Sequence, residues 1–186
     1  MAIQQKITAA DFWEISQWAE NQDKDIELIN GEIEEMASNP RTSKQAMNLG
    51  RHILNYLDTN DIRHLTGEAG GYTMDDGNTF APDVAFIFYE RQRELPETGF
   101  NPVPPDLAAE FISPSDIKDP KRRIFKKLET YQALRVPLVW YFYPERQEVE
   151  IYRPDQPTQT LGIDDVLDGG DVLPGFSLPL KQIFKS

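Results

Sequence analysis

Several short apolar runs, each of the length of a strand, most constrain the fold of this chain. The runs cover residues 79–89, 107–112 and 136–143, and a further strand is expected over 148–153. A segment with helical spacing, 116–134, separates the second run from the third. Strands that alternate with helices in this way are typical of a sheet with helices packed against it. The pattern predicts an α/β (α+β) domain with a mixed central β-sheet flanked by helices.

The N-terminal part predicts three further elements. A helix is expected over about 8–20, a β-hairpin over 25–36 and a longer helix over 41–57. The hairpin rests on Asn30-Gly31, the strongest short hairpin signal, which lies between two strand-like runs. Segments 90–105 and 154–160 are expected to be loops, and the tail over 173–184 a packed C-terminal cap.

Composition excludes several classes of protein. The 186 residues include no Cys and two His, which excludes disulfides, thiol catalysis and Cys-based zinc sites. No apolar run approaches the ~18 residues of a membrane span, and the first residues lack the apolar core of a signal peptide. We therefore expect a single domain over 1–186 that is cytoplasmic and has no membrane partner.

Glu110 departs most clearly from its surroundings. It stands at the centre of the apolar run 107–112, and on a strand it shares one face with Ala108 and Ile112. Burying a carboxylate without a partner costs several kcal/mol, so a buried Glu110 requires a cation, a metal or a function. The alternative is an edge strand on which Glu110 faces water.

Asp83 and Lys127 are the other two candidates. Asp83 precedes the apolar run 84–88, where it can present a ligand at the mouth of a strand or merely cap a turn. Lys127 lies at the edge of the apolar stripe of its helix, so it can reach inward or snorkel to water. The stripe is formed by Ile124, Leu128, Tyr131 and Leu134. Two carboxylates and a lysine suit Mg²⁺-assisted phosphodiester hydrolysis.

Six motifs follow one another along the chain. They are ELINGE at 27–32, PDV at 82–84, EFISPS at 110–115, KLETY at 127–131, VPLVWY at 136–141 and LPGF at 173–176. In this order and spacing the sequence resembles the Uma2-type restriction endonuclease family, formerly a domain of unknown function common in cyanobacteria. That family lies within the PD-(D/E)XK nuclease superfamily.

The resemblance implies a restriction-endonuclease-like core that hydrolyses DNA with Mg²⁺ (or Mn²⁺). It implies that Asp83 and Glu110 bind the metal and act in catalysis. The superfamily carries a lysine two residues after the second acid, where this chain has Ile112. The resemblance assigns that role to Lys127 on the next helix. Glu27 is either an additional acid of the site or a surface residue of the hairpin.

Two alternatives remain open at this point. Many relatives carry a His near the start of the second helix, and residues 41–45 contain none. Together with the acidic charge, this allows a catalytically weak or inactive nuclease-fold protein that binds or regulates. The aromatic run 140–143 allows a homodimer module if it is exposed, although it can equally alternate between the two faces of a buried strand. A nuclease of this superfamily is itself compatible with a homodimer.

The distribution of charge limits how DNA can bind. The net charge is −12, which argues against a protein whose whole surface binds nucleic acid. Residues 116–135, however, carry seven basic side chains against three acidic ones. A local basic face can guide a phosphate backbone despite a negative total. The candidates for nucleic-acid binding are Lys118, Arg122, Arg123 and Lys126, with an ordinary solvated helix face as the alternative.

Overall fold

The computed structural model describes residues 6–36, 39–58, 63–119 and 123–185. Its helices are α1 (Ala9–Ser16), α2 (Pro40–Leu57), α3 (Pro114–Lys118), α4 (Arg123–Ala133) and α5 (Lys181–Phe184). Its strands are β1 (Ile26–Ile29), β2 (Glu32–Glu35), β3 (Arg63–Gly67), β4 (Tyr72–Thr73), β5 (Thr79–Phe80), β6 (Val84–Phe88), β7 (Leu107–Phe111), β8 (Leu138–Tyr143), β9 (Glu148–Tyr152), β10 (Gln159–Gly162), β11 (Val166–Gly169) and β12 (Leu173–Pro179).

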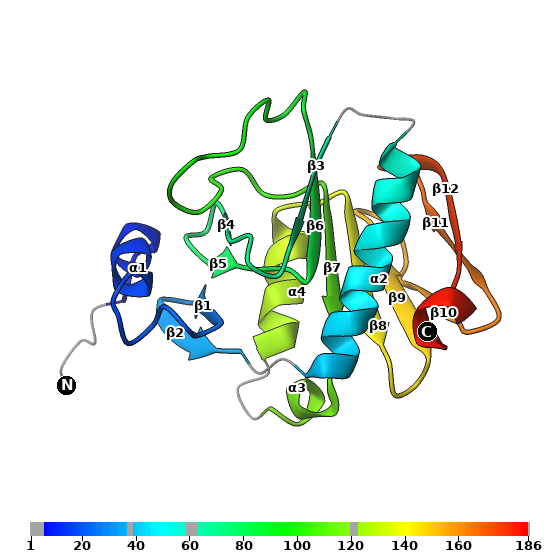
Figure 1. The fold of residues 1–186 in the computed structure, drawn as a ribbon, viewed down its shortest axis with the longest axis horizontal. Coiled ribbons are helices and arrows are strands. Elements are labelled where there is room, and N and C mark those ends of the chain that lie inside the picture. Colours follow the sequence, from blue (N-terminus) through cyan, green and yellow to red (C-terminus); the bar gives the residue numbers. More distant parts are fainter. Residues whose placement is uncertain (1–5, 37–38, 59–62, 120–122, 186) are drawn as a thin grey trace.

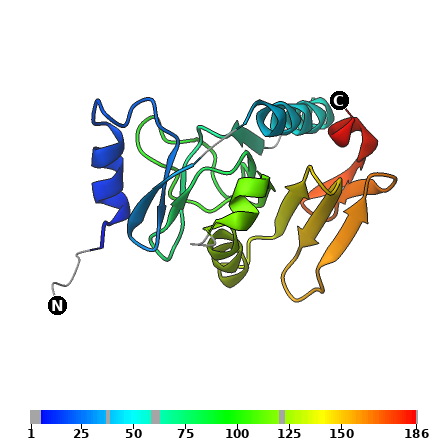
Figure 2. The same ribbon diagram turned by 90° about the horizontal axis from the view of Figure 1, so that it is seen from below.

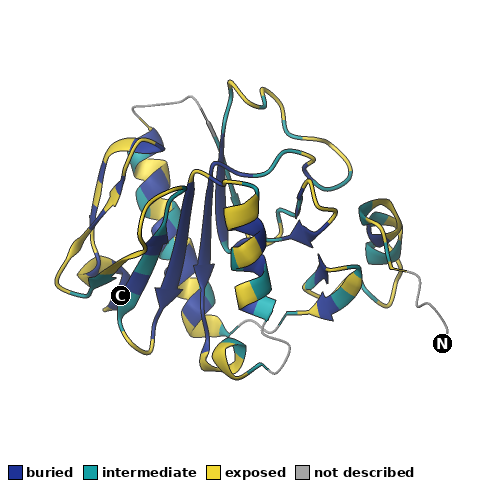
Figure 3. Cartoon of the chain, turned by 180° about the vertical axis from the view of Figure 1, so that it is seen from behind, coloured by how far each residue is buried: buried dark blue, intermediate teal, exposed yellow. Residues whose placement is uncertain are grey.

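A six-stranded sheet in the order β10-β9-β8-β7-β6-β3 forms the centre of the molecule (Figure 1). Strands β7 and β8 run parallel, and the other neighbours in this sheet are antiparallel. The central strands are buried along most of their length (Figure 3). The predicted α+β class with a mixed central sheet is therefore confirmed.

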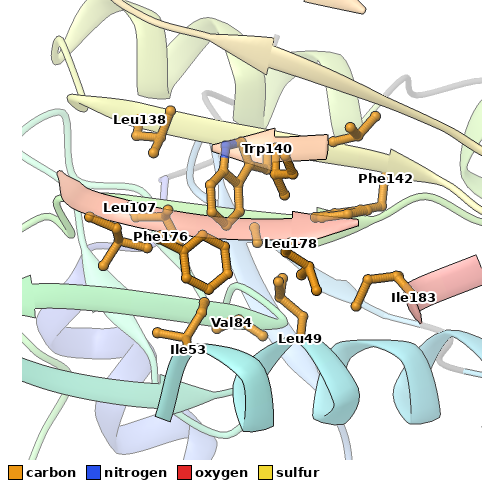
Figure 4. Close-up of a cluster of buried hydrophobic side chains, with 14 of the residues drawn as sticks. Leu49, Ile53, Val84, Leu107, Leu138, Trp140, Phe142, Phe176, Leu178 and Ile183 are labelled. Carbon is orange, nitrogen blue, oxygen red and sulfur yellow. The ribbon is translucent and has the colours of Figure 1, made fainter. Parts of the chain in front are cut away.

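Helices cover both faces of this sheet, as the perpendicular view shows (Figure 2). On one face, α2 packs with the C-terminal hairpin β11–β12 and α5 around a large apolar core (Figure 4). On the other face lies α4, where the Tyr141 hydroxyl donates to the carbonyl of Ile124 at 3.0 Å. Because side chains alternate along β7, Leu107 and Ala109 face α2, whereas Ala108 faces α4. The predicted packed C-terminal cap is also confirmed.

The N-terminal elements form a second sheet in the order β2-β1-β5-β4. The predicted hairpin is confirmed: Asn30 and Gly31 both have positive φ, 55° and 80°, as a tight primed turn requires. Helix α1 begins with a complete capping box between Thr8 and Asp11 but ends at Ser16, earlier than expected.

Two predicted elements are each divided in the structure. The expected strand 79–89 is two strands in different sheets, because Pro82 lacks the N–H that a continuous ladder needs. The expected helix 116–134 is also two elements: Ser113 and Asp116 form a capping box that starts α3 early, and α4 begins only at Arg123. Part of the expected loop 154–160 pairs with β9 as strand β10.

The aromatic run on β8 is not exposed. Trp140, Tyr141, Phe142 and Tyr143 are all buried and alternate between the two cores. An aromatic interface patch at this strand is therefore wrong, and a homodimer stays a prediction. Among the described residues, no helix combines the length and apolar character needed to cross a membrane.

The C-terminal hairpin β11–β12 covers the apolar core beside α2. We therefore expect that removing the aromatic ring of Phe176 from this hairpin lowers the free energy of unfolding strongly. Phe176 is 5% exposed and stacks on Trp140 with ring centroids 6.1 Å apart (Figure 4). We expect Phe176→Ala to lower the free energy of unfolding by about 3–5 kcal/mol, measured by denaturant titration. Val166→Ala, at a 49% exposed position of the same hairpin, should change it by less than about 0.5 kcal/mol. Equal effects of the two substitutions would contradict this packing.

Candidate active site

Lys127 is a buried residue of α4, and its side chain contacts a carboxylate from each of the two sheets. Its side chain is 2% exposed, and its Nζ lies 2.9 Å from Oε1 of Glu27 and 2.8 Å from Oε1 of Glu110. The Phe80 ring lies 5.6 Å from the ammonium nitrogen, within the range of a cation–π contact. The inward orientation predicted from helical spacing is confirmed, and a snorkelling Lys127 is excluded.

Glu110 lies on an interior strand. Its strand, β7, is flanked by β6 and β8, so the edge-strand alternative is wrong. The residue is 5% exposed and faces α4, the same side as Ala108 and Ile112. Its Oε1 accepts a second hydrogen bond from the hydroxyl of Tyr131 at 2.8 Å. Burial of this carboxylate is therefore balanced by two donors on one helix.

Asp83 lies directly before β6, at the point where the chain leaves the N-terminal sheet. Its Oδ2 accepts a hydrogen bond of 2.6 Å from the backbone N–H of Phe111. Because Phe111 follows Glu110, this bond places the two predicted metal-binding acids beside each other on neighbouring strands. The alternative was that Asp83 caps a turn. Its side chain does accept from a backbone N–H, but this N–H belongs to the neighbouring strand β7 and not to a local turn.

Glu27 belongs to the site and not to the surface. It is 2% exposed on β1, and its Oε1 accepts both the Lys127 ammonium and, at 2.8 Å, the backbone N–H of Ala81. Its Oε2 is buried and has no hydrogen-bond partner within the described part of the chain. The interpretation of Glu27 as an exposed hairpin residue is therefore wrong.

A cavity of about 380 Å³ opens beside these four side chains. All four line it, and Glu68 adds another carboxylate. Other parts of its lining are aromatic: Trp13 and Phe100 contact each other edge to face, with ring centroids 5.2 Å apart. The cluster is thus buried within the protein but accessible to a molecule that enters the cavity.

Negative charge exceeds positive charge in this cluster. Burial raises the pKa of Asp83 to about 6, although the Phe111 N–H and Lys127 oppose the shift. Burial also raises the pKa of Glu110 to about 8, against the attraction of Lys127. Burial alone would lower the pKa of Lys127, but the charges of Glu110 and Glu27 raise it well above its usual value. Three carboxylates thus share one ammonium.

The residues present fit a divalent cation. Asp83 and Glu110 supply carboxylate oxygens, which Mg²⁺ prefers, and Mg²⁺ keeps several of its waters when only one or two carboxylates bind it. Within the described residues, no group of three or more Asp, Glu or His side chains forms a complete ligand cluster. The excess of carboxylates over ammonium groups agrees with a cation at this place, and Glu27 lines the same cavity.

The predicted basic surface is smaller than expected. Arg123 is ion-paired, with its Nε 2.6 Å from Oδ2 of Asp119 and its Nη1 3.5 Å from Oε2 of Glu34. Arg122 lies outside the described residues. Lys118 is exposed and Lys126 is half-buried. Of the four candidate residues, Lys118 and Lys126 are the ones that the described structure leaves for a phosphate backbone.

The sequence did not indicate three donors of the site. These are the hydroxyl of Tyr131 and the backbone N–H groups of Ala81 and Phe111. Tyr131 belongs to the apolar helical stripe, so it is indistinguishable from a core residue by pattern. The available signal was its position four residues after Lys127, which puts both side chains on one face of the helix.

Comparison with known proteins places this arrangement in a class. A structure with the same fold is the "Crystal structure of a putative nuclease belonging to DUF820 from Anabaena variabilis ATCC 29413", which aligns with a TM-score of 0.79 and 19% sequence identity. The alignment covers 96% of this chain and 98% of that one. This chain therefore shares its fold with that putative nuclease.

The family follows from the sequence. The Uma2 family, described as "Putative restriction endonuclease", matches residues 12–181, and the chain belongs to this family. No curated protein matches the sequence.

The raised carboxyl pKa values predict that the metal-free protein loses stability as the pH rises. Asp83 and Glu110 have ordinary pKa values of 3.8 and 4.5 and values of about 6 and about 8 in the folded protein. The folded state therefore binds more protons than the unfolded chain between about pH 4 and pH 8, and its free energy of unfolding falls across that window.

Melting temperatures measured in a chelator from pH 5 to pH 8 test this expectation. Asp83→Asn should flatten the decline, because it removes one of the two titrating groups. Asp75→Asn, on an exposed turn, is the control and should leave the decline unchanged. A decline equally steep in Asp83→Asn and the wild type would contradict the assignment.

Proposed function

We propose that this protein is a Mg²⁺-dependent endonuclease that hydrolyses phosphodiester bonds of DNA. The observation that carries the proposal is the convergence of Asp83, Glu110, Lys127 and Glu27 at one cavity. Membership of a family described as "Putative restriction endonuclease" supports this reaction class. The four residues come from both sheets and α4, so ordinary core packing does not account for their meeting.

Asp83 and Glu110 would hold the metal ion. When bound, Mg²⁺ (or Mn²⁺) lowers the pKa of a water molecule and offsets negative charge on the phosphoryl group. The protein prepares this position by keeping both carboxylates at fixed places: the Phe111 N–H holds Asp83, and Lys127 holds Glu110. Preorganised charges of this kind require little rearrangement during the reaction.

Lys127 acts as a cation and not as a base. The charges of Glu27 and Glu110 keep its pKa well above the usual value, so the ammonium stays protonated at neutral pH. An ammonium has three N–H donors, and the two carboxylates accept two of them. The third can donate to a phosphoryl oxygen or to the attacking water, which stabilises charge as it develops.

Glu27 completes the arrangement around the water. Its Oε1 anchors Lys127, whereas its buried Oε2 accepts no hydrogen bond from the described residues. Glu27 lines the cavity, and a small movement of its side chain would expose Oε2 to a water there, which would then donate to this oxygen. Glu27 thereby orients the water and can accept its proton as the phosphodiester is attacked.

Cleavage of plasmid and single-stranded DNA in Mg²⁺ or Mn²⁺ tests the proposal. We expect Asp83→Asn and Glu110→Gln each to lower the rate by about 10²–10³, since each removes a charge at the reacting centre. Glu129→Gln, at an exposed position of α4, is the matched control and should cleave as the wild type does. Activity that the two site variants retain in full would refute the assignment.

The same experiment separates the alternative of a binding or regulatory protein. A wild type that binds metal and DNA but cleaves neither DNA form, under conditions in which the fold is intact, would favour that alternative. The absence of His from residues 41–45 is the sequence observation behind it.

Lys118 and Lys126 are expected to contribute to DNA affinity and not to sequence selection. Replacing both by Ala should weaken binding by a similar factor for unrelated sequences and reduce the salt slope by about one for each phosphate that the variant no longer neutralises. Fluorescence anisotropy at several salt concentrations measures both quantities. Lys44→Ala, an exposed lysine on α2, is the control. An unchanged salt slope in the double variant would place the DNA elsewhere.

A further inference from the structure

Tyr131 brings a second donor to the same oxygen of Glu110 that Lys127 contacts. The Tyr131 hydroxyl and the Lys127 ammonium each lie 2.8 Å from Oε1 of Glu110. The two donors are four residues apart on α4, so they stand on one face of the helix, one turn from each other. One helix thus holds a carboxylate of the central sheet through a single atom.

This arrangement distinguishes the two oxygens of Glu110. A carboxylate oxygen has two lone-pair positions, and Lys127 and Tyr131 occupy those of Oε1. Oε2 keeps its own lone pairs, and Glu110 lines the cavity. Oε2 is therefore the oxygen of Glu110 that remains for a cation.

We propose that Tyr131 is a positioning residue: its hydroxyl, together with Lys127, fixes the Glu110 carboxylate so that Oε2 is the atom offered to a divalent metal ion. The inference rests on the metal site of the proposed function and deepens it. Tyr131 does not itself contact the metal or the DNA in this arrangement. Its effect on metal binding passes through Glu110.

A purely structural role does not account for the choice of acceptor. The Tyr131 ring fills the core edge to face with Phe80, at a centroid distance of 5.6 Å, and a phenylalanine would fill the same space. A buried tyrosine hydroxyl needs an acceptor, but a backbone carbonyl would suffice. Tyr141 shows this simpler solution, because its hydroxyl donates to the carbonyl of Ile124 at 3.0 Å.

Tyr131 and Tyr141 therefore form a matched pair. Both are buried, with 0% and 1% exposure, in the core between α4 and the central sheet, and both use the hydroxyl as a donor. They differ in the acceptor, which is the Glu110 carboxylate for Tyr131 and a peptide carbonyl for Tyr141. Replacing either by Phe removes one buried hydroxyl and one hydrogen bond.

Calorimetric titration of the full, metal-free chain with Mn²⁺ alone provides the test. We expect Tyr131→Phe to weaken Mn²⁺ binding about tenfold, as is typical when a residue that orients a metal ligand is replaced. Tyr141→Phe should bind within about twofold of the wild type, with a similar change in melting temperature. The electron paramagnetic resonance spectrum of bound Mn²⁺ should differ from wild type in Tyr131→Phe and not in Tyr141→Phe.

Wild-type affinity in Tyr131→Phe, or an equal loss in both variants, would overturn the inference. If Tyr131→Phe does not fold, the unaltered protein supplies the measurement. The proton resonance of the Tyr131 hydroxyl should move when Mg²⁺ is added, while that of Tyr141 stays in place. An unmoved Tyr131 resonance at saturating Mg²⁺ overturns the inference as well.

Failure of this inference is distinguishable from failure of the proposed function. A wild type whose Mn²⁺ affinity depends on Tyr131 but which cleaves no DNA leaves the positioning role intact and removes the nuclease. If the wild type cleaves DNA and Tyr131→Phe binds Mn²⁺ with wild-type affinity, the nuclease function stands and the positioning role of Tyr131 is removed. A wild type that binds no Mn²⁺ at millimolar concentration overturns both.

Discussion

The paired contacts of one buried ammonium hold the active-site region together. Lys127 reaches from α4 to Glu27 on β1 and to Glu110 on β7, so a single side chain joins the helix to both sheets. Removing such a charge from water costs several kcal/mol, which the two carboxylates offset only while all three elements are docked. Breaking one of these contacts therefore leaves an uncompensated charge inside the protein.

The acidic charge of the chain is compatible with DNA as the proposed substrate if a divalent cation binds at the cluster. The cluster gathers three carboxylates around one ammonium, and the nearby Arg123 is engaged by Asp119 and Glu34. A polyanion such as DNA gains little from the protein alone at this site. A divalent cation, if bound as proposed, would change the balance, because it would add positive charge at the place proposed for the phosphate.

Much of the site was predictable because its residues violate simple patterns. Glu110 interrupts the apolar run of a buried strand, and Lys127 lies at the edge of an apolar helical stripe, from which it can reach inward. Glu27 violates no pattern, because the hairpin alternates acidic and apolar residues and an inward Glu27 looks the same as an outward one. Tyr131 was hidden for the opposite reason: an aromatic residue on an apolar stripe is what a core contains.

The fold was predictable to a similar extent. The central strands and α2 follow from apolar periodicity, and the first hairpin from its turn residues. The division of 79–89 between two sheets and of 116–134 between two helices was not, because capping and sheet assignment depend on tertiary partners. Strands β3 and β10 carry polar or exposed residues, so their hydrogen bonding to neighbours is not visible in the sequence.

The position of Ile112 has a consequence for how the site assembles. Ile112 is 3% exposed and belongs to the apolar core, at the position where the nuclease motif considered in the sequence analysis carries a lysine on the strand. If the lysine were at position 112, the backbone of β7 alone would place both the acid Glu110 and the lysine. Here the positive charge arrives on a separate helix, so the local chain geometry of β7 cannot create the site. The cluster of Glu27, Glu110 and Lys127 therefore forms only in the docked tertiary structure, when α4 packs on the sheet.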